Sequence, residues 1–102
     1  MKLKILLPTE ILLDDEVSKI TAEAGNGSFT LLPRHVDFVA ALAPGILSCE
    51  TGGEEVFFAV DEGILVKRGV DVLVSTRGAF RGPDLGQLKQ AVEEEFKSLD
   101  EK

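Results

Sequence analysis

The chain has 102 residues, enough for one hydrophobic core, and 44% of them are hydrophobic against 28% charged, as in ordinary globular proteins. Its formal net charge of −7 argues against nucleic acid or an anionic membrane as the primary partner. The single cysteine excludes an intramolecular disulfide, and no run approaches the ~20 apolar residues that cross a bilayer. We therefore expect a soluble protein that meets a membrane only through a partner.

Short strands are predicted along the first half of the chain. Residues 2–7 and 17–24 alternate between polar and apolar side chains, which is typical of half-buried strands. The acidic run 14–16 between them is expected to be a solvated turn, and Gly25-Asn26-Gly27 predicts a hairpin because both residue types tolerate positive φ. The nearly uncharged run 36–42 predicts a strand that is buried on both faces.

The second half continues the same pattern up to Pro83. Residues 46–50 and 56–60 flank the turn Thr51-Gly52-Gly53-Glu54, and two more short strands follow at 64–66 and 70–75. In the last of these, alternate valines are expected to share one face: Val70, Val72 and Val74. Many short strands with turn signals every 8–12 residues predict a β-sandwich or a barrel.

The pattern changes to that of a helix after Pro83. Asp84 is a good helix start, since an acid there lies near the positive end of the helix dipole. An apolar stripe follows at spacings of three and four: Leu85, Leu88, Val92, Phe96 and Leu99. We expect residues 1–83 to form the β domain and 84–102 a truncated helical region. The stripe could pack on its own sandwich or on a partner.

The sequence predicts no catalytic residue, cofactor site or metal site. His35 is the only histidine, and Cys49 lies inside a predicted strand, where it is expected to be a small buried hydrophobe. His35 is either a turn residue bonded to the local backbone or an interface contact. The glycines at 25 and 27 lead into a strand and lack the Gly-Lys-Ser/Thr ending of a phosphate loop. We therefore expect the protein not to be an enzyme.

The order of the turns carries a family resemblance. Gly25-Asn26-Gly27 precedes Leu32-Pro33-Arg34-His35, a strand, and then Pro44-Gly45-Ile46-Leu47. The later segment Asp61-Glu62-Gly63-Ile64-Leu65-Val66 continues the match, and Pro8, Leu13, Val17 and Ile20 have the expected spacing before it. This series resembles the epsilon subunit of rotary F-type ATP synthases over about the first 83 residues plus one helix. The resemblance implies a mainly β fold, a flattened sandwich of about ten strands followed by a C-terminal helix.

The resemblance also implies a role without catalysis. Such a subunit belongs to the central stalk of the rotor, binds the gamma subunit and the membrane c-ring, and couples ion translocation to ATP synthesis or hydrolysis. We expect it at the cytoplasmic face of a prokaryotic membrane, in a peripheral complex, and as a monomer in isolation. Residues 84–102 lack the Ile/Leu-Asp-x-x-Arg-Ala pattern with which some members bind ATP, and the inhibitory second helix lies outside this chain.

The interface with gamma and the ring is expected on loops. Ser28 stands where many relatives carry Glu, Arg34 where they carry Gly, and Phe29 is expected to be an exposed aromatic residue at the loop tip. The candidates at this turn are Ser28, Phe29, Leu32, Pro33, Arg34 and His35, with Arg77 and Arg81 as weaker ones. The alternative function is a free-standing β-sandwich adaptor that binds another protein through the same loops.

Overall fold

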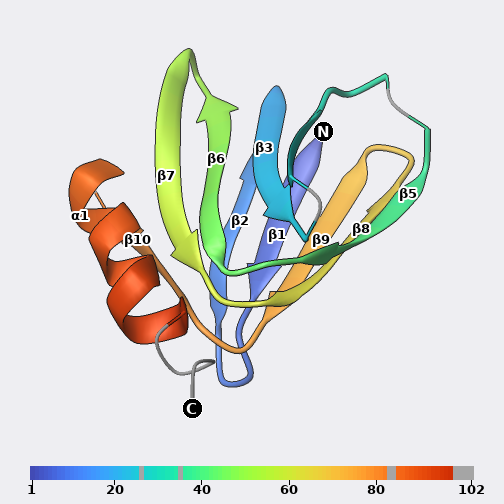
Figure 1. Cartoon of the computed structure of the whole chain (residues 1–102). Coiled ribbons are helices and arrows are strands. Elements are labelled where there is room, and N and C mark those ends of the chain that lie inside the picture. Colours follow the sequence, from blue (N-terminus) through green and yellow to red (C-terminus); the bar gives the residue numbers. More distant parts are fainter. Residues whose placement is uncertain (26, 35, 83–84, 98–102) are drawn as a thin grey trace.

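Ten strands and one C-terminal helical segment make up the described part of the chain (Figure 1). The computed structural model describes residues 1–25, 27–34, 36–82 and 85–97. The strands are β1 (Lys2–Leu6), β2 (Ile11–Glu16), β3 (Lys19–Ala24), β4 (Gly27–Leu31), β5 (Phe38–Leu42), β6 (Gly45–Thr51), β7 (Glu54–Val60), β8 (Gly63–Arg68), β9 (Asp71–Thr76) and β10 (Ala79–Gly82). The helix α1 (Leu85–Ala91) continues into the π-helical turn η1 (Val92–Lys97).

A single hydrogen-bonded sheet folds over on itself to make the sandwich. Its order is β10-β7-β6-β3-β5-β8-β9-β1-β2, and β4 pairs with the other edge of β3. The fold-over lies at β3, which pairs with β6 through residues 19–21 but meets β5 only at Ala24 and Leu42. Beyond that point β5, β8, β9, β1 and β2 form the second layer. The predicted ten-stranded sandwich followed by a helix is confirmed.

Because most neighbouring strands are antiparallel, the connections gather at two ends of the sandwich. We call one the loop end, at the top of Figure 1; it holds residues 32–34 and 36–37, the β6–β7 turn and the β8–β9 turn. The other is the corner end, with the β3–β4, β7–β8 and β9–β10 connections. It also holds the step from β5 to β6, where the chain changes layers.

The step between layers is fixed by Glu23 of β3. Its carboxylate accepts a hydrogen bond from the amide of Ile46 at 3.0 Å, and its carbonyl accepts one from the amide of Ala43 at 3.0 Å. A Cβ on Gly45 would lie 2.6 Å from this carboxylate. The Pro44-Gly45 pair therefore turns the chain at a place where a larger residue would push the Glu23 carboxylate out of its present position.

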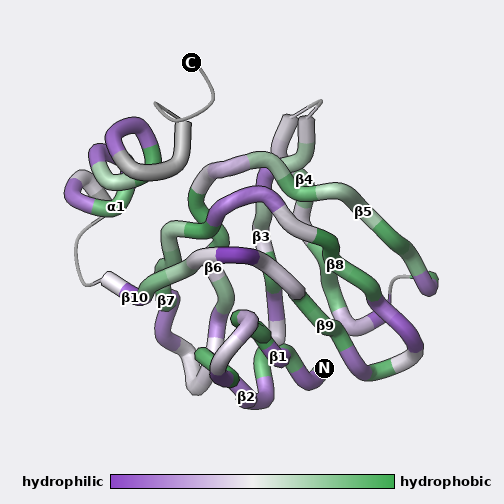
Figure 2. Tube along the Cα trace, turned by 90° about the horizontal axis from the view of Figure 1, so that it is seen from below, coloured by the Kyte–Doolittle hydropathy of each residue, from purple (hydrophilic) through white to green (hydrophobic). Residues whose placement is uncertain are grey.

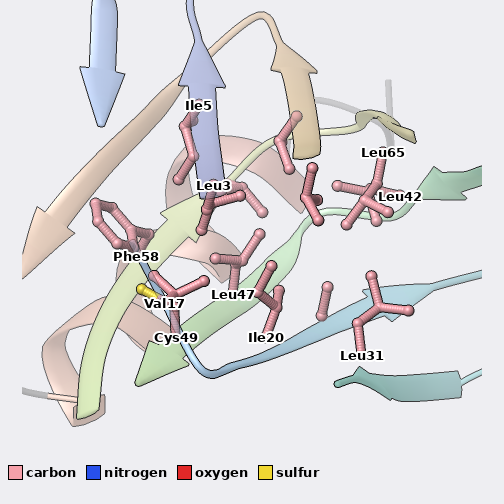
Figure 3. Packing of buried hydrophobic residues seen from close by; sticks show 14 of the residues in the cluster. Leu3, Ile5, Val17, Ile20, Leu31, Leu42, Leu47, Cys49, Phe58 and Leu65 are labelled. Carbon is pink, nitrogen blue, oxygen red and sulfur yellow. The ribbon is translucent and has the colours of Figure 1, made fainter. Parts of the chain in front are cut away.

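The core lies between the two layers. Inward-facing side chains alternate with outward ones along each strand, so Leu3 and Ile5 of β1 point toward Leu47 of β6 and Phe58 of β7 (Figure 3). Among the described residues, the largest apolar side chains that are fully buried include Phe58, Leu3, Ile5, Ile20, Leu47 and Leu65. Burial of this kind provides the main stabilisation of the sandwich.

The helix packs on the sandwich of its own chain. Leu88 and Val92 are buried against Ala59 of β7, with half-buried aromatics from β7 and β10 around them. A Cβ on Gly82 would lie 2.6 Å from Leu88 Cδ2, so glycine lets the helix approach β10 closely. Of the predicted stripe, Leu99 and the side chains of Leu85 and Phe96 lie outside the described residues.

The acidic run at 14–16 is strand rather than the predicted turn. β2 continues through these residues and pairs with β1, where Lys4 faces Asp14 and Lys2 faces Glu16. Lys2 Nζ lies 3.7 Å from a carboxylate oxygen of Asp14. The cross-strand lysines neutralise acids that would otherwise disfavour a strand, a pairing that lies too far away in sequence for local pattern to reveal.

The prediction that residues 36–42 are buried on both faces is also wrong. β5 starts only at Phe38, and its outward residue Val39 is 67% exposed, while Val36 before the strand is 81% exposed. Val70 was expected to share a face with the next two alternate valines, but it lies in the β8–β9 turn, 67% exposed. Apolar side chains are therefore displayed at this side of the molecule.

A threonine at the corner end ties two turns together, and its loss should weaken the fold. Thr76 is 7% exposed, and its hydroxyl lies 3.0 Å from the carbonyl oxygen of Glu62 and 3.2 Å from that of Asp61. Thr76→Val keeps the shape and removes the hydroxyl, so we expect a loss of about 1–2 kcal/mol in the free energy of unfolding, measured in urea. Thr30→Val, at an exposed position, is the control. Equal losses of stability in the two variants would show that the hydrogen bonds of the Thr76 hydroxyl do not stabilise the fold.

Candidate partner-binding surfaces

The outer face of β5, β8 and β9 carries a cluster of apolar side chains. Val39, Val66 and Leu73 are neighbours in register across the three strands, and Ala41 and Ile64 form the next row. We call these five residues the outer patch. Val39 is 67%, Ile64 47% and Leu73 37% exposed. Figure 2 shows hydrophobic residues along β5 and β8, on the side of the molecule away from α1.

Charged residues of alternating sign border the outer patch. Arg68, Asp71, Lys2 and Glu16 face one another in register across β8, β9, β1 and β2. Lys2 and Arg68 also line a shallow groove whose floor includes Val66 and Leu73. An apolar centre with a balanced polar rim is the usual composition of a protein–protein interface.

The opposite outer face is different. The helix covers the apolar part of β7 and β10, and the uncovered part of β3 and β4 is polar. There the hydroxyls of Thr21 and Thr30 lie 3.1 Å apart, and Ser18 donates to the Glu50 carboxylate at 3.2 Å. The outer patch is therefore the surface whose composition best suits an apolar contact with another protein.

The candidate residues of the predicted loop do not lie at one turn. Ser28 is paired with Glu23 next to the β3–β4 hairpin, at the corner end. Leu32, Pro33 and Arg34 follow the far end of β4 and are exposed at the loop end. His35 lies outside the described residues. The length of β4 separates the candidates into two groups.

Phe29 is not the exposed aromatic residue that the sequence suggested. It is half-buried, packs against the main core, and meets Phe38 edge-to-face with ring centroids 5.3 Å apart. Because β4 alternates, Phe29 faces inward while Ser28 and Thr30 face solvent. The pair joins β4 to β5 at the base of the intervening loop.

The two weaker candidates lie apart from the loop and from each other. Arg77 is at the corner end, where its guanidinium lies 3.2 Å from Asp61 and 3.3 Å from Glu62. Arg81 is exposed on β10, next to a narrow crevice that also contains Cys49. Arg77 therefore already has intramolecular carboxylate partners, which any contact with another chain would have to share.

Sequence reasoning missed the outer patch, because the run 36–42 has hardly any polar residue to mark an outward face. A signal existed in β9, where Asp71, Leu73 and Ser75 alternate with buried Val72 and Val74. That alternation places Leu73 on the polar, solvent side of its strand. An apolar residue at an outward position is the pattern that identifies such a surface.

Cys49 is a buried thiol in a position that makes it unreactive. It is 2% exposed, and burial raises its pKa from 9.0 to about 11, against a smaller lowering by Arg81. The unfolded chain therefore loses this proton at a lower pH than the folded chain. The free energy of unfolding should be insensitive to this group below pH 9 and fall as the pH rises from about 9 to about 11.

This dependence can be measured by guanidinium unfolding of the wild type and of Cys49→Ala at pH 8, 9.5 and 10.5. We expect the wild type to lose stability more steeply than the variant over that range, because only the wild type carries the titrating thiol. The same slope in both proteins would show that burial does not hold the thiol in its protonated form.

Within the described ranges, no three His, Cys, Asp or Glu side chains gather in a way that would hold a metal ion. The helical residues that the structure covers form no segment long and apolar enough to cross a membrane.

Comparison with known proteins identifies the family. The model of the ATP synthase delta/epsilon chain β-sandwich domain matches residues 1–82, which is most of the chain. The chain belongs to the ATP synthase delta/epsilon family. The epsilon chain is a non-catalytic subunit of the synthase, so membership agrees with the expectation that the protein is not an enzyme.

Two similar bacterial proteins are ATP synthase epsilon chains. ATP synthase epsilon chain 2 of Paraburkholderia xenovorans strain LB400 is 35% identical over 97 residues, covering 91% of this chain and 69% of that one. The ATP synthase epsilon chain of Sulfurovum sp. strain NBC37-1 is 32% identical over 97 residues, covering 92% and 75%.

Similar solved structures come from mitochondrial ATP synthases. A chain in the Euglena gracilis assembly of OSCP, F1 and c-ring superposes with a TM-score of 0.74 and 29% identity, covering 90% of this chain and 61% of that one. A chain in the Tetrahymena thermophila central stalk and c-ring superposes with a TM-score of 0.67 at 20% identity, which supports the fold alone. The chain described here spans about three fifths of the length of each of these two mitochondrial chains.

Proposed function

We propose that the protein is a central-stalk epsilon subunit that binds the gamma subunit through the outer patch and the neighbouring loop end. The observation that carries this proposal is the outer patch itself: five apolar residues on one sheet face, left uncovered while the chain's own helix covers the other layer. Burying exposed apolar area of this kind is the main favourable term in most protein association. Residues 1–83 would act as the partner-binding unit and 84–102 as its helical extension.

The contact with the c-ring belongs to the corner end. Ser28 and Arg77, two of the residues expected to touch partners, both lie there, on the side of the molecule opposite Leu32 and Arg34. A rotor subunit that links two partners needs separate contact regions, and the two ends of a stiff sandwich supply them. In this arrangement the chain would transmit torque at the cytoplasmic face of the membrane and couple ion translocation to ATP synthesis or hydrolysis.

The proposal is tested by co-expressing the chain with cognate gamma and c subunits and purifying the complex through a tag on the c-ring. We expect the chain in stoichiometric amount with gamma, and a large loss from the ring when gamma is omitted. A folded chain that is absent from ring–gamma complexes would contradict the rotor assignment. That result would favour the free-standing adaptor, which would bind another protein through the same surfaces.

A further inference from the structure

A charged side chain is buried in the layer that carries the outer patch. Lys67 of β8 is only 1% exposed and faces inward on the same side of the strand as Leu65. Its ammonium group donates a hydrogen bond to the carbonyl oxygen of Gly69 at 2.7 Å. Lysine is almost never buried without polar partners, and this bond is one of the interactions that hold the ammonium group in place.

The same glycine is held from a second element. The amide of Gly69 donates to a carboxylate oxygen of Asp37 at 2.7 Å, and Asp37 comes directly before β5. Gly69 has φ of +60°, the left-handed conformation that presents its amide and carbonyl at the β8–β9 turn. Lys67 and Asp37 thus fix one residue through its two backbone polar groups.

The hydrogen bonds of Gly69 to Lys67 and Asp37 anchor the end of the loop that leaves β4. The loop begins next to Phe29 and ends at Phe38, whose rings meet edge-to-face, and Phe38 faces Lys67 in register. Between these anchors Leu32, Arg34 and Val36 are exposed. The loop is therefore held at its base by aromatic packing and at its end by the Asp37–Gly69 bond, while its described residues 32–34 and 36 face solvent.

Burying an ammonium group is an inefficient way to stabilise a core. Replacing buried ionic groups by apolar ones of similar volume is often neutral or stabilising, and such groups can instead fix one arrangement of the chain. Gly69 is exposed, so its carbonyl can bond to water if Lys67 is replaced. The Lys67 ammonium is then needed for the geometry of the loop end more than for folding.

We propose that Lys67 and Asp37 are positioning residues, which hold the described loop residues 32–34 and 36–37 and the β8–β9 turn in the one relative arrangement that docks on gamma. This inference rests on the proposed function, since it assigns part of the gamma contact to the loop end. Holding a binding loop in its bound conformation improves affinity because less ordering remains to be done on binding.

The main test replaces Lys67 by methionine. We expect Lys67→Met to melt at the wild-type temperature or above it, and yet to bind gamma about tenfold more weakly, because the loop must then be ordered on binding. Amide exchange at Gly69, Leu32, Arg34 and Val36 should become faster in the isolated variant. Lys89→Met, the same change at an exposed helix position on the other layer, should alter none of these.

Asp37 gives a second test with a conservative rescue. Asp37→Ala removes the acceptor of the Gly69 amide and should weaken gamma binding, whereas Asp37→Asn retains a side-chain oxygen and should bind like the wild type. Wild-type affinity and unchanged exchange in both Lys67→Met and Asp37→Ala would overturn the proposal. If the unaltered chain failed to bind gamma, the proposed function would fall, and the exchange rates alone would decide whether the two residues hold the loop.

Discussion

Gly63→Ala should cost about 3 kcal/mol of the free energy of unfolding, because there is no room for a methyl group at this position. Gly63 begins β8 and is paired with Leu42 on one side and Thr76 on the other. A Cβ there would run into the main-chain oxygen of Ser75 and lie 3.0 Å from Thr76 Cβ. Since β9 is hydrogen-bonded to β8 along its length, that oxygen cannot move away alone.

The measurement is thermal unfolding followed by circular dichroism. A loss of this size should lower the melting temperature by about 15 °C in a domain of this length. Gly25→Ala is the matched control: nothing lies within 4 Å of its Cβ position, and we expect a change within about 0.5 kcal/mol. Similar melting temperatures for the two variants would show that β8 and β9 are not as close as the structure places them.

The double variant Val39→Lys and Ile64→Lys should lose gamma binding by a factor of about 100 or more. These side chains lie in adjacent rows of the outer patch, on neighbouring strands, and a hot-spot residue at the centre of an interface contributes about 2 kcal/mol or more. Burying two ammonium groups against an apolar surface adds a desolvation cost. Because the two residues are 67% and 47% exposed, the substitutions should leave the fold intact.

Thr30→Lys is the control for added charge, since Thr30 is exposed on the polar face of the other layer. Binding is followed by surface plasmon resonance on immobilised gamma, and folding by circular dichroism. We expect the control to bind like the wild type. If the double variant bound gamma with unchanged affinity, the outer patch would not be part of the contact. The loop end would then remain as the proposed gamma-binding region.

The strands that sequence reasoning predicted well are those with one face in the core. Ile20 and Ala22 on β3 alternate with polar residues, and their burial follows from that alternation. β2 was missed at its acidic end because the lysines that stabilise it belong to β1, across the sheet. The parallel pairing of β1 with β9 joins residues 2–6 to 71–75. The sequence of neither segment indicates which strand it pairs with.

The binding surfaces were harder to predict than the strands, because they depend on which residues meet in space. Ser28 and Leu32 are close in sequence, but the run of β4 carries them to opposite ends of the sandwich. The outer patch is the reverse case, since Val39 and Leu73 are far apart in sequence and come together only through β8. The burial of Lys67 could not be predicted from the sequence, because a lysine in a strand is normally an exposed residue.

We propose that the outer patch and the loop end of this chain dock together on gamma. Isothermal titration calorimetry of the chain into the purified cognate gamma subunit, at several temperatures, tests this docking most directly. We predict one-to-one binding with a clearly negative heat-capacity change, the mark of buried apolar surface. The absence of binding by a folded chain, or binding with a heat-capacity change near zero, would contradict docking on gamma through the apolar outer patch.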